Sequence, residues 1–164
     1  MIHSFAPIAE ADARCLILGS IPGKASLQAG QYYAHPRNQF WPIMLSLFNG
    51  ETDWDYRQRT QMLKAHGIAL WDVMHSCRRR SSLDADIETA SVVINDFADF
   101  FSQHPQIKVV FFNGGTAEQN FKRQVLPLLN HSPRLIRLPS TSPAHAAMRF
   151  SAKLQSWQQI REFC

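Results

Sequence analysis

The chain has 164 residues, of which 45% are hydrophobic and 18% are charged, and its formal net charge at pH 7 is +4. This composition excludes a disordered tail and a fibrous protein, and we expect residues 1–164 to form a single domain. No apolar run reaches the roughly 18 residues of a membrane span, and the first residues lack the pattern of a signal peptide. We therefore expect a cytoplasmic protein.

The three cysteines, Cys15, Cys77 and Cys164, are spread widely over the chain. So few cysteines do not make a disulfide scaffold, and they are one short of a four-thiolate zinc or iron–sulfur centre. We therefore expect no metal and no cofactor, and a reducing compartment.

Four short apolar runs predict buried strands. They cover residues 15–18, 68–71, 108–112 and 134–138. Apolar residues at helical spacing predict helices between and after these runs. The helical faces carry Phe40, Ile43, Met44 and Leu47; Ile94, Phe97 and Phe101; Ala117, Phe121, Val125 and Leu128; and Leu154, Trp157 and Ile160. This alternation predicts an α/β fold in three layers, with a central four-stranded, mainly parallel sheet flanked by helices.

Turn-forming and polar residues follow each predicted strand. These segments are Gly19–Gly23, Asp72–His75, Asn113–Thr116 and Pro139–His145. Ligands of parallel sheets bind at the carboxyl ends of the strands, so we expect the functional site there. The first segment departs from the phosphate loop of an NTPase, because three residues rather than four separate its glycines and Lys24 is followed by Ala25.

Aromatic and polar residues alternate over residues 32–41. Aromatic rings in a loop can stack on nucleobases. We assign Phe40 and Trp41 to the core and favour a functional role for Tyr32 and Tyr33. Further along, the basic run 78–80 suits phosphate contacts, although a solvated loop is the simpler interpretation.

Three segments, Gly19–Gly23, Tyr33–Trp41 and Pro139–Ala144, together resemble motifs of the uracil-DNA glycosylase superfamily. The resemblance is strongest to its hypoxanthine-DNA (deoxyinosine) glycosylase branch. It implies a monofunctional DNA repair enzyme that flips a deaminated base out of the duplex and hydrolyses its N-glycosidic bond, leaving an abasic site. It implies no covalent intermediate and no metal. Hypoxanthine is the favoured base, uracil and xanthine stay open, and we expect a monomer that binds DNA.

The resemblance implies that Asn38 is the catalytic residue, which holds the attacking water or hydrogen-bonds the base. The expected base-binding residues are Gly19, Ser20, Ile21, Pro22, Gly23, Tyr33, Asp72 and Asn113. The expected DNA-binding residues are Ser140, Thr141, Ser142, Pro143, Ala144 and His145. Ile21 stands where other branches carry a water-orienting Asp or Asn, and Leu138 stands where a His often begins the last motif. Asn38 therefore has to take over if the chain is catalytic.

Several alternatives stay open. Asp72 could be a helix cap or turn residue, Asn113 could merely close a turn, and His145 could simply start a helix. The whole chain could be a damage-binding module with little turnover. It could also be an enzyme that binds small nucleotides, or a structural domain.

Overall fold

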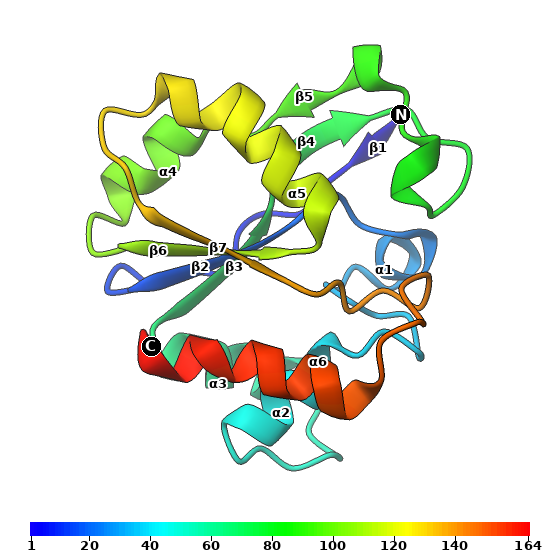
Figure 1. Cartoon of the computed structure of the whole chain (residues 1–164), viewed down its shortest axis with the longest axis vertical. Coiled ribbons are helices and arrows are strands. Elements are labelled where there is room, and N and C mark those ends of the chain that lie inside the picture. Colours follow the sequence, from blue (N-terminus) through cyan, green and yellow to red (C-terminus); the bar gives the residue numbers. More distant parts are fainter.

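The computed structural model describes residues 1–164, and its centre is a four-stranded parallel sheet (Figure 1). The strand order is β3-β2-β6-β7, and all neighbours are parallel. The strands are β2 (Cys15–Gly19), β3 (Ile68–Asp72), β6 (Val109–Asn113) and β7 (Arg134–Leu138). In register, Gly19 lies beside Asp72 and Asn113 beside Leu138, so the segments that follow the strands share one edge. The predicted sheet is confirmed.

Helices cover both faces of this sheet (Figure 1). On one face lie α2 (Phe40–Leu47), α3 (Tyr56–Ala65) and α6 (Phe150–Trp157). On the other face lie α4 (Phe97–Gln103) and α5 (Gly115–Asn120). The remaining helix, α1 (Lys24–Ala29), follows the carboxyl end of β2. The three predicted layers are therefore present.

Local signals set several helix ends. Asp55 and Gln58 form a reciprocal capping box at the start of α3, with both bonds at 2.9 Å. Asp96 caps α4 by accepting a hydrogen bond from the Asp99 amide at 3.0 Å. After α5 the chain continues through a π-helical turn and then a 3₁₀ turn, Leu126–Leu128. Leu128 is 77% exposed, so the apolar face predicted there stops short of it.

A second, antiparallel sheet was not predicted. It has the order β1-β4-β5, with β1 (Ile2–His3), β4 (Met74–Cys77) and β5 (Val93–Ile94). These strands are too short to show an alternating pattern in the sequence. The assignment of Ile94 to a helical face was wrong, because this residue pairs with Met74 and the helix begins only after the cap at Asp96.

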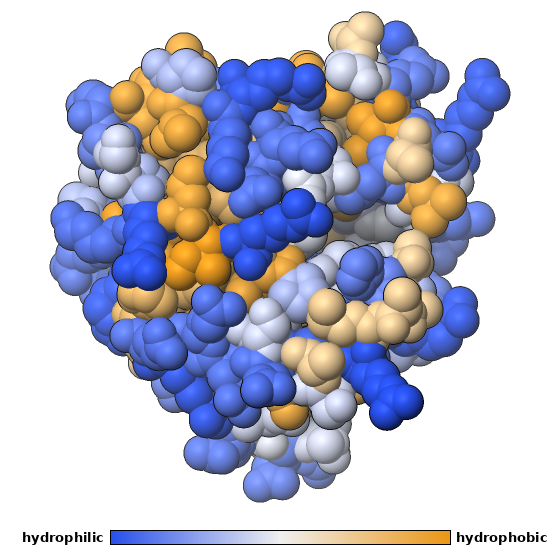
Figure 2. All heavy atoms as spheres, viewed as in Figure 1, coloured by the Kyte–Doolittle hydropathy of each residue, from blue (hydrophilic) through white to orange (hydrophobic).

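The core explains why the strands could be predicted. Every residue of β2 and β3 is buried, as expected for strands covered on both faces. Phe40 and Trp41 belong to this core, as predicted, but so does Tyr32. Its hydroxyl donates to the Ala6 carbonyl at 2.9 Å, so the functional role that we favoured for Tyr32 is wrong. Figure 2 shows that hydrophilic residues cover most of one outer face, with apolar atoms in separate groups. No helix is long and apolar enough to cross a membrane.

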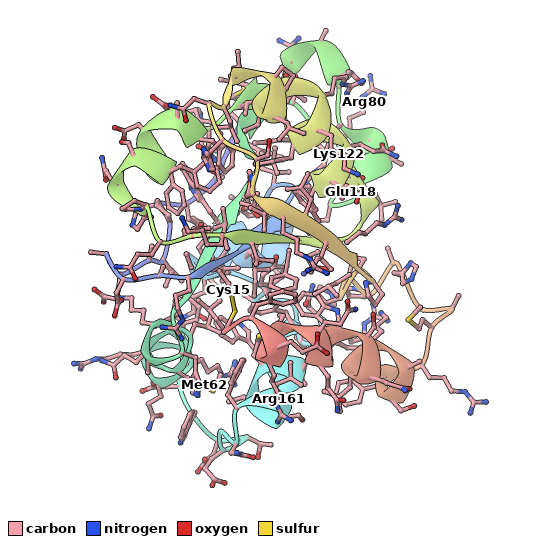
Figure 3. The ribbon with its side chains drawn as sticks, turned by 60° about the vertical axis from the view of Figure 1, so that its left-hand side comes forward. Cys15, Met62, Arg80, Glu118, Lys122 and Arg161 are labelled. Carbon is pink, nitrogen blue, oxygen red and sulfur yellow. A yellow bond between two sulfur atoms is a disulfide. The ribbon has the colours of Figure 1, made fainter.

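A disulfide joins Cys15, at the start of β2, to Cys164, at the end of the chain (Figure 3). These residues are 149 positions apart in the sequence, but their Cα atoms are 6.3 Å apart in space. The sequence analysis did not foresee the bridge, because distance along a chain does not report distance in the fold. Cys77 remains a free, buried thiol.

The bridge predicts a redox-dependent stability. Cys164→Ser should lower the free energy of unfolding by about 2–4 kcal/mol, because cross-linking so distant residues restricts the unfolded chain. Denaturant unfolding with and without a reducing agent measures this. The reductant should lower the free energy of unfolding of the wild type to that of the variant, and it should leave the value of the variant unchanged. An unaffected wild type would show that the two thiols are not joined.

Candidate functional site

At the carboxyl ends of β2 and β3, the side chains of Tyr33 and Asp72 pack against the backbone of Gly19, and we call this three-residue cluster the recess. A Cβ atom at this position would lie 2.6 Å from Asp72 Oδ1 and 2.8 Å from Tyr33 Oη. Only glycine therefore lets both groups approach the backbone so closely. Tyr33 Oη and Asp72 Oδ2 are buried and have no hydrogen-bond partner in the chain. Unpartnered buried polar atoms are rare and costly, so they mark the recess as a place for a ligand.

Asp72 is the most strongly perturbed carboxyl group of the site. Its side chain is almost fully buried, and burial raises its pKa to about 7. The negative charge of Asp84 contributes to this rise, and the positive charge of Arg79 opposes it. Because β4 begins two residues later, Asp72 caps no helix, which removes the helix-cap alternative considered for it.

Tyr33 and Asn38 come from the loop between α1 and α2. The Tyr33 ring stacks on Phe40, with centroids 4.2 Å apart, and its φ of 55° is in the left-handed region. Burial and the charge of Asp72 raise the pKa of Tyr33, so its hydroxyl stays protonated. Asn38 Oδ1 accepts a hydrogen bond from the Phe40 amide at 2.9 Å, which fixes the side chain beside the start of α2. Asn38 Nδ2 has no partner and remains free to donate.

Asn113 clamps the segment that follows β7. Its Nδ2 donates to Thr141 Oγ1, and its Oδ1 accepts from the Thr141 amide, both at 2.9 Å. The Thr141 carbonyl in turn accepts from the Gln39 amide at 3.0 Å, next to Asn38. Asn113 therefore joins two loops rather than closing its own turn. Thr141 is 1% exposed with its hydroxyl turned inward, which corrects the phosphate contact expected for that hydroxyl.

The Gly19–Gly23 segment uses its backbone more than its side chains. The Ile21 side chain packs into a small core with Met74 and Cys77, away from the recess. Any contact of Ile21 with a ligand must therefore be made by its backbone. The amides of Ile21 and Gly23 have no hydrogen-bond partner within the chain, and Gly23 precedes α1.

A loop that follows β4 packs on this segment. Arg79 donates to the Pro22 carbonyl at 2.7 Å, and the Ser20 hydroxyl donates to Asp84 Oδ1 at 2.8 Å. Of the other two arginines in the run, Arg78 pairs with Glu88 at 2.9 Å and Arg80 is exposed. The basic run had been noticed in the sequence. Nothing there indicated Asp84, because a tertiary contact brings it to the site.

The segment after Thr141 forms a surface loop. Ser140 and Ser142 are half-buried, and their hydroxyls accept hydrogen bonds from the Ser142 and Ala144 amides, both at 3.2 Å. Pro143 is half-buried, whereas Ala144 and His145 are exposed. The His145 carbonyl accepts from the buried ammonium of Lys153 on α6 at 2.8 Å, which anchors the loop from behind.

A cavity of about 410 Å³ lies beside the recess, shares Tyr33 with it and is also lined by Asn38. A second hollow of about 480 Å³ is lined by Glu10, Ala11, Asp12, Lys64 and Ala65. These residues precede β2 and β3, so that hollow lies at the amino edge of the sheet and is not part of the site. No group of three or more His, Cys, Asp or Glu side chains is placed to hold a metal ion.

Comparisons with known proteins agree with this arrangement. The family model described as the uracil DNA glycosylase superfamily matches residues 6–161. A hypoxanthine DNA glycosylase of Methanosarcina barkeri is 36% identical over 113 residues, which are 68% of this chain and 70% of the relative. A hypoxanthine DNA glycosylase of Methanosarcina acetivorans is 30% identical over 160 residues, which are 96% of each chain. The solution structure of a candidate uracil DNA glycosylase of M. acetivorans superposes with a TM-score of 0.81 at 28% identity, covering 98% of this chain and 96% of that one.

The family model and these relatives thus define the class of enzyme as the DNA glycosylases, whose substrate is DNA. The chain belongs to the uracil DNA glycosylase superfamily. The resemblance read from its motifs is therefore confirmed at the level of the family.

Proposed function

We propose that this DNA glycosylase acts as a monomer on duplex DNA and releases hypoxanthine. Two relatives named for hypoxanthine, one of them matched over nearly the whole chain, support this substrate. Uracil and xanthine are secondary candidates, because they carry the same lactam edge, an N–H donor beside a carbonyl acceptor.

The observation that carries the proposal is the recess at Gly19, with the unpartnered Asp72 Oδ2 and Tyr33 Oη. A neutral carboxylic acid offers an O–H donor beside a carbonyl acceptor, which complements a lactam edge. With a pKa of about 7, Asp72 is partly protonated at neutral pH and can play this part. The Tyr33 ring, held by Phe40 on one side, supplies a face on which the flipped base stacks.

Bond cleavage then needs a positioned water and groups that stabilise the negative charge of the departing base. The glycosidic bond breaks with its electron pair going to the base, and the sugar becomes oxocarbenium-like. Asn38 holds the water that adds to the sugar carbon, and the proton of this water ends on the departing base. The free amides of Ile21 and Gly23 are fixed dipoles that stabilise charge on the base.

The loop after β7 grips the DNA. Ser140 and Ser142 offer hydroxyls to the phosphates beside the flipped nucleotide, together with backbone groups of Pro143 and Ala144. The exposed His145 and the apolar side chain of Met148 fill the space that the base leaves in the stack.

Duplexes that carry one hypoxanthine, uracil, xanthine or unmodified adenine test the proposal. Base release leaves an alkali-labile abasic site, so strand breakage after alkali reports it. We expect breakage with hypoxanthine and none with adenine. Tight retention of the hypoxanthine duplex without breakage would identify a damage-binding module instead. Release of uracil or xanthine alone would overturn the preference for hypoxanthine.

A further inference from the structure

We propose that the 410 Å³ cavity beside the recess binds a phosphodiester group of the damaged strand through Arg59. The inference rests on the proposed position of the flipped nucleotide at Tyr33 and Asn38. It assigns a DNA-contacting role to a residue of α3, a helix that none of the recognised motifs includes.

Arg59 is unusual among the arginines of the chain. Its side chain is partly buried, and its Nε atom is fully buried with no hydrogen-bond partner. The guanidinium makes no ion pair and no hydrogen bond within the chain. Arg79 also has a buried, unpaired Nε, but its Nη2 donates to a backbone carbonyl, and the exposed Arg161 does the same. A guanidinium carries five N–H donors, and leaving such donors buried and unpaired is costly. The buried Nε donor of Arg59 therefore lacks an acceptor, which a ligand in the cavity can supply.

The chemistry of the cavity favours an anion. Its lining includes the cation Arg59 and contains no carboxylate. The polar members are Gln31, His35, Asn38, Ser46, Thr52 and Arg59. The planar fork of a guanidinium matches the oxygens of a phosphate and donates two parallel hydrogen bonds to them. Hydroxyl and amide donors around it can satisfy the remaining oxygens.

The position of the cavity identifies the anion as part of DNA. Tyr33 belongs to both the recess and the cavity, and Asn38 also lines the cavity, so the backbone of a nucleotide whose base lies in the recess passes close to the cavity. Phe150 forms part of the rim and follows directly on the surface loop that carries His145 and Met148. A phosphodiester adjacent to the flipped nucleotide on the same strand is therefore the group that Arg59 can reach.

The test compares Arg59→Gln with Arg57→Gln on a duplex that carries a tetrahydrofuran abasic-site analogue. Arg57 lies on the same helix and is exposed, and its side chain makes no hydrogen bond or ion pair within the chain, so it controls for the loss of one positive charge. We expect Arg59→Gln to weaken binding about 5- to 20-fold and to lower the slope of log K against log salt by about 1. Arg57→Gln should change affinity less than 2-fold, roughly as expected for a distant surface charge.

Methylphosphonate substitution then locates the contact. Replacing single phosphates beside the analogue should weaken wild-type binding at one flanking position, and Arg59→Gln should be insensitive at that same position. Arg59→Lys, which keeps the charge but loses the fork, should fall between the two proteins. If thermal denaturation shows that Arg59→Gln does not fold, Arg59→Lys replaces it in these binding measurements.

Equal affinities and salt slopes for the two glutamine variants would overturn the inference. So would a methylphosphonate profile that the Arg59 variants leave unchanged. The analogue has no base to release, so these outcomes do not depend on which base the enzyme prefers. Failure of hypoxanthine release would refute the proposed substrate and leave the Arg59 result intact.

Discussion

Asn38→Ala is expected to slow the release of hypoxanthine by about 10²- to 10³-fold at saturating enzyme, the usual cost of removing one preorganised polar group from a site of charge development. The structure gives the side chain two separate tasks. Oδ1 accepts from the Phe40 amide, and Nδ2 is left free for water or substrate. The alanine variant removes both tasks, so its loss of activity alone does not separate them.

Asn38→Asp separates them, because it keeps the oxygen that fixes the start of α2 and removes the free donor. Both variants should be compared by single-turnover rates and by denaturant unfolding. We expect the alanine variant to lose about 1 kcal/mol of stability with its hydrogen bond and the aspartate variant to lose less. Slow release by both variants assigns catalysis to Nδ2. Full activity of Asn38→Ala would remove this residue from the catalytic role.

The second large effect is a dependence of the free energy of unfolding on pH, which we expect Asp72 to cause. In the folded protein its pKa is about 7, whereas the ordinary value in an unfolded chain is 3.8. Between these values the folded state holds a proton that the unfolded state releases. The free energy of unfolding therefore falls as pH rises from about 4 to about 7, and the contribution of this group is flat above that range.

Asp72→Asn carries no titrating group and should lack this slope. The difference between wild type and variant should change by up to about 4 kcal/mol across the window, since each unit of pKa shift corresponds to about 1.4 kcal/mol. Denaturant unfolding of both proteins at pH 4, 5, 6, 7 and 8 measures it. If the free energies of unfolding of wild type and Asp72→Asn changed in parallel with pH, the carboxyl of Asp72 would have its ordinary pKa in the folded protein.

The same change should alter the pH dependence of catalysis. Above about pH 7 an ionised Asp72 places a second negative charge beside the departing base, so the wild-type rate should fall. The asparagine side chain keeps an N–H donor and an oxygen acceptor, so Asp72→Asn should release base with a flatter profile. Asp72→Ala should be slow at every pH. A wild-type falling limb that persists in Asp72→Asn would assign the titration to another group.

The sequence predicted the parallel sheet because its strands are buried on both faces and read as uninterrupted apolar runs. For the same reason Gly19, Asp72 and Asn113 could be expected at one edge of the sheet. Their partners could not be predicted. The hydrogen bonds between Asn113 and Thr141 depend on how two loops fold back on one another. No motif in the sequence marks Arg59, which lines the cavity, or Asp84, which bonds to Ser20. Tyr32 and Tyr33 are adjacent in sequence, yet one ring enters the core and the other the recess.

The hydrogen bonds of Thr141 to Asn113 and Gln39 have a mechanical consequence. Thr141 is tied to β6 through Asn113 and to the residue that precedes α2 through Gln39. The loop after β7 and the start of α2 are consequently coupled through Thr141, so a displacement of one is transmitted to the other. If this loop binds the DNA backbone and Asn38 positions the attacking water, as proposed, engagement of a phosphate and alignment of the water are parts of a single movement.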